Sequence, residues 1–158
     1  TLELTATPYS TWASSFGLNP LTDGAPGVDH DGDGLANMVE FALGGDPTSG
    51  SNNAKTYSLV ADSDADVDAT NELILTIAVR SGTPAFAGTP SPSAIKDGAT
   101  YTIQGSPDLG TFTAAVTPVS PVTTGLPAAP AGYEYRSFSL DGSNGMPSKG
   151  FLRVQIGY

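Results

Sequence analysis

The sequence predicts a mainly β fold, an antiparallel β-sandwich, from three observations. Beyond residue 54, short apolar segments alternate with turn sequences. Nineteen glycines and thirteen prolines in 158 residues favour many turns over long helices. The clearest helical pattern lies within the first fifty residues. We therefore expect a single domain, with a short N-terminal strand over residues 1–8, a small two-helix, calcium-loop insertion over 9–50, and the sandwich over 51–158.

The first seven residues alternate between apolar and polar side chains, as a half-buried strand does. Leu2, Leu4 and Ala6 share its apolar face. Pro8 ends this strand, and Ser10 is expected to cap a short helix that closes at Gly17. One face of that helix carries Tyr9, Trp12, Ala13 and Phe16. The single tryptophan is predicted to pack against Val39 and Leu43 rather than to stack on a sugar.

The stretch from Asp29 to Glu40, DHDGDGLANMVE, fits the calcium loop of an EF-hand at each diagnostic position. Carboxylates occupy positions 1, 3 and 5, and a glycine allows the sharp turn at position 6. Ca²⁺ takes about six to eight oxygen ligands, which alternate residues of a curled loop can supply. The predicted ligands are Asp29, Asp31, Asp33, the Leu35 carbonyl, Asn37 or its bound water, and Glu40. An Asp/Gly turn that binds nothing is the alternative, but it leaves Asn37 and Glu40 unexplained.

The segments around this loop differ from those of an ordinary EF-hand. Two glycines and a proline in residues 22–28 exclude an entering helix. An exiting helix is predicted from the spacing of Leu35, Met38, Val39, Ala42 and Leu43, and Gly44-Gly45 stops it. Asp23 and Asp46 are expected to be turn residues, and either can add an indirect contact to the ion. His30 is expected to point outward.

A calcium loop with only its exiting helix resembles the motifs of dockerins and thrombospondin type 3 repeats. The run from Gly17 to Pro47, GLNPLTDGAPGVDHDGDGLANMVEFALGGDP, is similar to a module near the C-terminal ends of large secreted bacterial surface proteins. In that module a short Trp-containing helix precedes the loop and a β-domain follows it. The resemblance covers about thirty residues and implies export and calcium, but no reaction.

Six strands are predicted in the remainder of the chain: 55–61, 72–80, 99–105, 112–119, 133–140 and 150–157. The strand over 72–80 is apolar on both faces and is expected to be central. Turn signals separate the strands at Asp97-Gly98, Ser106-Pro107-Asp108, Asp141-Gly142 and Asn144-Gly145. Proline-rich stretches over 81–93 and 118–132 are expected to be long loops.

Composition and the remaining acidic residues limit the classes of function that we expect for the protein. A net charge of −10 argues against binding nucleic acid or an anionic membrane, and no apolar run reaches membrane length. With no cysteine and one histidine, we expect no enzyme; a carboxylate pair such as Glu72 with Glu134 has no sequence reason to meet. Alternating aspartates at 62–68 before Glu72 form either a second ion loop or, preferably, a solvated acidic hairpin, since Val67 replaces the required glycine.

These features predict a non-catalytic, calcium-stabilised structural protein, extracellular or at the cell surface. We expect it to assemble head to tail with copies of itself, residues 1–7 completing a neighbour's sheet. The start at Thr1 fits a processed secreted protein or an excised domain. Two alternatives stay open: an anchoring C-terminal domain of a larger secreted protein, and a carbohydrate-binding module. The second would bind glycans on exposed tyrosines, drawn from Tyr9, Tyr57, Tyr101, Tyr133 and Tyr135.

Overall fold

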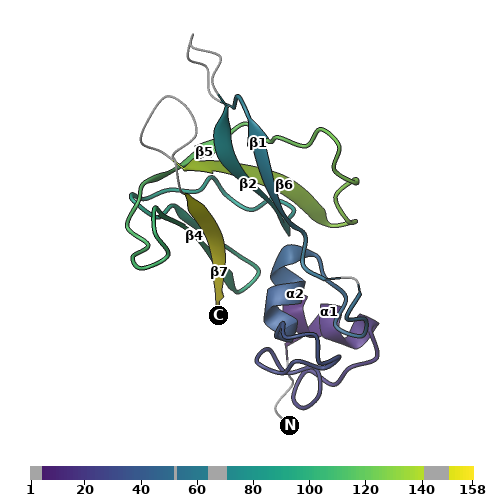
Figure 1. Ribbon diagram of the computed structural model, residues 1–158. Helices are drawn as coiled ribbons and strands as arrows, with labels where there is room; N and C mark the ends of the chain where they lie inside the picture. Colours follow the sequence, from purple (N-terminus) through teal and green to yellow (C-terminus); the bar gives the residue numbers. More distant parts are fainter. Residues whose placement is uncertain (1–4, 52, 64–70, 141–149) are drawn as a thin grey trace.

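Two antiparallel sheets and two short helices make up the protein in the computed structural model, which describes residues 5–51, 53–63, 71–140 and 150–158 (Figure 1). The elements are α1 (Pro8–Ser15), α2 (Asn37–Leu43), β1 (Thr56–Ala61), β2 (Glu72–Arg80), β3 (Ser93–Lys96), β4 (Ala99–Ser106), β5 (Val116–Val119), β6 (Tyr133–Leu140) and β7 (Phe151–Gly157).

The strands form one sheet in the order β1-β2-β6-β5 and a second in the order β3-β4-β7. Every neighbouring pair is antiparallel. The predicted β-sandwich with a small helical insertion is therefore confirmed. Strand β2 lies between β1 and β6, and seven of its nine residues are buried. This confirms that the segment with two apolar faces is central.

One hydrophobic core joins the helices to the sandwich. Phe41 of α2 and Tyr101 of β4 are both fully buried in it, together with Ile77 and Phe138 from the other sheet. Trp12 packs against the same core, with its ring 5.3 Å from that of Phe41. The helical pattern in the sequence did not include Phe41. The helices therefore close one end of the sandwich rather than forming a separate body (Figure 1).

The last turn of α2 is fastened to the sandwich through its backbone carbonyls. Tyr133 donates its hydroxyl hydrogen to the carbonyl of Phe41 at 2.7 Å, and Tyr101 donates to that of Ala42 at 2.9 Å. The amide of Lys55, just before β1, donates to the carbonyl of Leu43 at 2.8 Å. These carbonyls have no partner within a helix, so each bond satisfies a group that would otherwise need water.

The cationic side chain of Arg80, at the end of β2, reinforces this junction. Its guanidinium carbon lies 4.7 Å from the centre of the Phe41 ring and 5.1 Å from that of Tyr133. Its Nε donates to Asp97 at 3.1 Å, in the turn between β3 and β4. Cation–π contacts of this kind strengthen when they are partly desolvated. Arg80 thus connects both sheets to α2.

Helix α1 begins earlier than predicted. Thr7, not Ser10, is the N-cap, and Pro8 is the first helical residue, where its fixed φ suits the helix and its missing N–H costs nothing. Ser10 completes the capping box, accepting a hydrogen bond from the Thr7 amide at 2.8 Å. Most of the predicted strand over 1–7 lies outside the described residues. Residues 5–7 are exposed and belong to no strand.

Two other boundaries also differ from the prediction. Strand β3 (Ser93–Lys96) lies at the end of the predicted loop over 81–93. It pairs with β4 across the expected Asp97-Gly98 turn, in which both residues have positive φ, 53° and 88°. The strand predicted over 112–119 is shorter, because only Val116–Val119 pairs with β6. The turn signals at 141–145 lie outside the described residues.

We expect Tyr101→Phe to lower the free energy of unfolding by about 1–3 kcal/mol, because it leaves the buried carbonyl of Ala42 without its donor. Urea denaturation followed by circular dichroism measures this. Tyr135→Phe is the matched control, since its hydroxyl bonds to the carbonyl of Pro127 at an exposed position, and it should change stability much less. Equal losses in the two variants would contradict the role given to Tyr101.

Candidate metal centre

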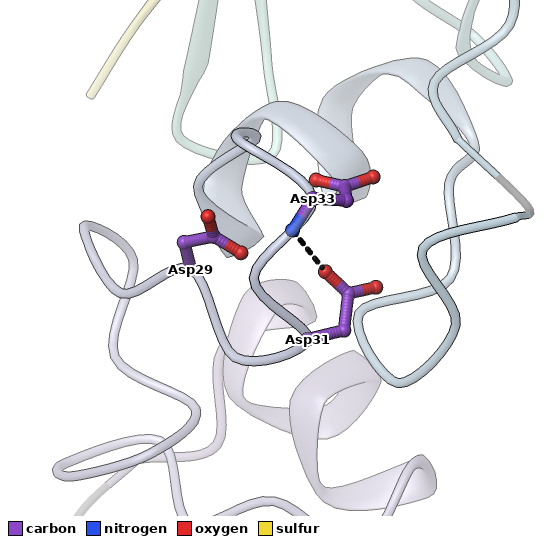
Figure 2. A group of neighbouring side chains, drawn as sticks. All are labelled: Asp29, Asp31 and Asp33. Atoms are coloured by element: carbon purple, nitrogen blue, oxygen red, sulfur yellow. Dashed lines mark hydrogen bonds between the residues drawn. The ribbon is translucent and has the colours of Figure 1, made fainter.

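The loop that follows residues 22–28, here called the approach segment, brings three aspartates together, as the sequence predicts (Figure 2). One carboxylate oxygen from each of Asp29, Asp31 and Asp33 lies within 4.8 Å of the other two. Such a group of oxygens can hold a metal ion. Three like charges so close together repel one another unless a cation lies between them.

Hydrogen bonds to these carboxylates fix the loop. Asp29 accepts from the amides of Gly32 at 2.8 Å and Gly34 at 2.9 Å, and both glycines have positive φ, 77° and 97°. Asp31 accepts from the amide of Asp33 at 3.1 Å, the bond drawn in Figure 2. Asp33 accepts from the amide of Leu35 at 2.8 Å. The chain therefore curls around its own carboxylates, as the Asp-x-Asp-Gly pattern requires.

Glu40 supplies a second and independent indication of a cation. Its side chain is fully buried in α2, and neither carboxylate oxygen has a hydrogen-bond partner among the described residues. Burial, followed by the charges of Asp31, Asp33, Asp46 and Asp29, raises the pKa of this carboxyl from 4.5 to about 8. A buried carboxylate without a partner is costly, and a bound cation would be the partner.

Two more of the predicted ligands carry unsatisfied oxygens. Oδ2 of Asp31 and Oδ1 of Asn37 are buried, and each lacks a hydrogen-bond partner within the described part of the chain. Among the described residues, four of the five buried oxygens of this kind therefore belong to residues that the loop pattern assigns to the ion, and the fifth, Oε1 of Glu134, pairs with Arg136 at 2.7 Å. Carboxylate and amide oxygens are the donors that hard divalent cations prefer. The chemistry of these oxygen donors therefore fits a hard divalent cation.

Asn37 also has a structural role that the sequence did not predict. Its Nδ2 donates to the carbonyls of Asp23 at 3.0 Å and Ala25 at 3.1 Å. The amides of Asn37 and Met38 donate to the carbonyls of Val28 at 2.7 Å and Pro26 at 3.0 Å. The start of α2 is thereby bonded to the approach segment, which has turns where an EF-hand has its entering helix.

Both flanking aspartates are turn residues, as predicted. Oδ1 of Asp23 accepts from the amides of Asn19 at 2.8 Å and Gly24 at 3.0 Å, and backbone hydrogen bonds, above all from Asn19, lower the pKa of that carboxyl. Its carbonyl contacts Asn37, so Asp23 supports a predicted ligand indirectly. Asp46 accepts from the amide and hydroxyl of Thr48 at 3.0 and 2.7 Å.

The segment that follows α2 covers the loop, which the sequence did not indicate. A Cβ on Gly45 would lie 3.1 Å from Oε1 of Glu40, and one on Gly50 would lie 3.1 Å from Cβ of Asp33. Asn53, with its amide oriented to satisfy both partners, donates to Oδ2 of Asp33 at 3.0 Å and to the carbonyl of Gly50 at 2.8 Å. Side chains at Gly45 and Gly50 would crowd Glu40 and Asp33, so the two glycines allow this segment to lie against the ion site.

The other carboxylates considered from sequence form no site with one another. Glu134 pairs in register with Val79, seven residues along β2 from Glu72, which is a separation of roughly 23 Å in a strand. Glu72 accepts hydrogen bonds from the amide and hydroxyl of Ser63. Most of the acidic segment over 62–72 lies outside the described residues, so neither the preferred acidic hairpin nor the alternative second ion loop is tested there.

The tyrosines do not form a common platform. Tyr9 and Tyr101 are buried, and Tyr9 donates its hydroxyl hydrogen to the carbonyl of Gly24 at 2.8 Å. Tyr57 and Tyr135 meet edge to face, with ring centres 5.9 Å apart. Tyr133 belongs to the junction with α2. His30 is exposed, as expected for position 2 of the loop.

Comparisons of the chain with protein-family models, curated proteins and solved structures find no match. None of the described helices is long and apolar enough to cross a membrane. The resemblance to dockerin and thrombospondin type 3 loops therefore rests on the residues of the loop themselves.

We expect the free energy of unfolding of the metal-free protein to fall as the pH rises from 4.5 to about 8. In this window the folded protein retains a proton on Glu40 that the unfolded chain has released, so raising the pH favours the unfolded chain. Urea denaturation in chelator across this pH range measures the slope. Glu40→Gln should make it less steep, and identical slopes in both proteins would contradict the buried site for Glu40.

Proposed function

We propose that the loop from Asp29 to Glu40 binds Ca²⁺ and that the protein is an extracellular structural module stabilised by this ion. One observation carries the proposal: the fully buried Glu40 carboxylate has two unsatisfied oxygens beside three clustered aspartates. An acidic cluster alone is common on protein surfaces. A buried carboxyl that shares the cluster's charge is not, because it must either hold a proton, as the raised pKa of Glu40 indicates, or be compensated by a cation.

The donor set favours Ca²⁺ over other divalent ions. The predicted ligands are all oxygens, the chain has no cysteine, and its single histidine is exposed, so zinc is disfavoured. Mg²⁺ requires tight octahedral geometry and usually keeps several waters, whereas this loop offers four carboxylates, a carbonyl and an amide. With Ca²⁺ bound, we expect metal–oxygen distances of about 2.3–2.6 Å.

The role of the ion is structural rather than regulatory. In calcium sensors an entering helix and an exiting helix open relative to each other. Here the approach segment has no helix, and the last turn of α2 is bonded to Tyr101, Tyr133 and the amide of Lys55. Opening would break these bonds. An ion that joins Glu40 of α2 to the loop would therefore lock the module onto the sandwich.

An extracellular location agrees with this chemistry. Calcium sites in extracellular modules bind with a Kd of about 10⁻⁴–10⁻³ M, which keeps them filled where calcium is abundant. Four carboxylates around a divalent ion also leave a net negative site in a chain of net charge −10, which suits high ambient calcium. The dockerin-like and thrombospondin-like character of the loop points the same way.

We expect Ca²⁺ at about one hundred times its Kd to stabilise the protein by about 2.7 kcal/mol, which differential scanning calorimetry detects as a higher Tm. Glu40→Gln should abolish most of this increase, because it removes a charged ligand at the centre of the site. Glu134→Gln is the matched control, since it is the same change on β6, outside the loop, and it should keep the full response. A Tm that chelator does not change would contradict the proposal.

Head-to-tail assembly through the N-terminal segment is a separate part of the proposed function. Leu2, Leu4 and Ala6 would complete the sheet of the next copy. Thr7 caps α1, so a donor strand would end before it.

Deleting residues 1–6 should leave a folded, calcium-binding monomer that no longer forms oligomers in size-exclusion chromatography with light scattering. The deletion keeps Thr7 because loss of an N-cap costs about 1 kcal/mol on its own. Leu2→Asp with Leu4→Asp is the full-length counterpart. Oligomers that survive both changes would refute assembly through this segment.

A further inference from the structure

A groove lies beside α1 where the helical module meets the sandwich. One part, with a volume of about 430 Å³, is lined by residues that include Trp12, Gly45 and Tyr133. A second part of about 500 Å³ extends along α1 toward Ala6. Trp12, Ser15 and Arg80 line both parts, so the two are continuous. These volumes are in the range of small-molecule sites in proteins.

The charge of this groove contrasts with that of the whole protein. The chain has six Lys and Arg against sixteen Asp and Glu, yet Arg80 and Lys55 both line the groove. Asp46 is the one acidic residue among its lining. Asp97 pairs with Arg80 at 3.1 Å and Nζ of Lys55 donates to the carbonyl of Asn53 at 2.8 Å, so both cations have protein partners. The groove is positive only relative to the strongly acidic surface around it, and this contrast favours a negatively charged ligand.

Arg80 is positioned to bind a carboxylate. Stacking on Phe41 and Tyr133 fixes the plane of its guanidinium, and its Nε donates to Asp97. A guanidinium has five N–H donors, and the bond to Asp97 uses one of them. Its side chain keeps 21% of its surface exposed. Donors thus remain on a pre-oriented group, and arginine suits the paired oxygens of a carboxylate.

The other lining groups suit a sugar ring with hydroxyls. Trp12 is half-buried, contacts Phe16 and Phe41 through ring edges at 5.3 Å, and lines both parts of the groove. The C–H groups of a sugar ring pack on an indole. The Asp46 carboxylate can accept hydrogen bonds from sugar hydroxyls, as it does from the hydroxyl of Thr48.

We propose that this groove binds an acidic saccharide, a uronic acid unit whose carboxylate pairs with Arg80 and Lys55 and whose ring lies against Trp12. This goes beyond the proposed calcium function, because none of these three residues belongs to the ion loop. It also differs from the tyrosine surface that the sequence offered as an alternative, since Tyr9 and Tyr101 are buried.

The single tryptophan allows a direct test, because its fluorescence reports only from this groove. A short oligogalacturonate titrated into the calcium-loaded full-length protein should change Trp12 emission saturably. Neutral oligogalactose of the same length should bind at least about tenfold more weakly, the loss expected for one charge-assisted hydrogen bond. An oligoglutamate peptide should also bind more weakly, because it has no sugar ring to lie against Trp12. Affinity should also fall with added salt.

Charge variants locate the site. Arg80→Gln should weaken oligogalacturonate binding by about tenfold, and Lys55→Gln should weaken it several-fold. Arg153→Gln, the same charge change on β7, should leave the binding unchanged. Lys55→Gln keeps the test decisive if Arg80→Gln destabilises the junction. An emission that does not saturate, equal binding of the neutral sugar or the peptide, or variants with unchanged affinity would overturn the proposal. Calcium binding, measured separately by calorimetry, should be unaffected by Lys55→Gln, so failure here and failure of the ion site are distinguishable.

Discussion

The last turn of α2 is the constraint on which the arrangement of the two parts depends. A helix ends with four backbone carbonyls that have no partner inside it. Here the amides of Gly44 and Gly45 bond to the carbonyl of Glu40, and the sandwich supplies donors for those of Phe41, Ala42 and Leu43. Helix α2 has only seven residues and would not be stable alone in water. It exists because its end is completed by tyrosines from both sheets and by the backbone before β1.

The junction between α2 and the sandwich also holds the candidate ion site rigid. Glu40 stands one residue before the three carbonyls that the sandwich holds, so its buried carboxylate cannot swing to solvent without loosening the helix. Gly45 and Gly50 then allow the covering segment to approach the loop closely. An ion bound to Glu40 and the aspartates would join the loop to the core by way of α2. The carboxyl whose ionisation destabilises the metal-free protein is the same group that would bind the cation.

The chain has few cationic residues, and one of them, Arg80, lies at the junction between α2 and the sandwich. Arg80 lies between the rings of Phe41 and Tyr133 and bonds to Asp97, so it connects α2, β6 and the turn before β4. The same placement leaves part of its guanidinium at the groove beside α1. A residue that stabilises the junction therefore also gives this surface a positive patch. The architecture and the proposed ligand site are physically linked through one side chain.

Features that depend on local pattern could be predicted from the sequence: the central apolar strand β2, the Asp97-Gly98 turn, the aspartate loop and the approach segment without a helix. Period, turn chemistry and ligand spacing are local properties, so neighbouring residues encode them. The folded chain was needed to show that Phe41 and Tyr101 share one core, that Asn37 holds the approach segment, and that Gly45, Gly50 and Asn53 cover the loop. It also placed Arg80 beside Trp12. These contacts join residues far apart in the chain, and nothing in the local pattern specifies which distant groups will meet.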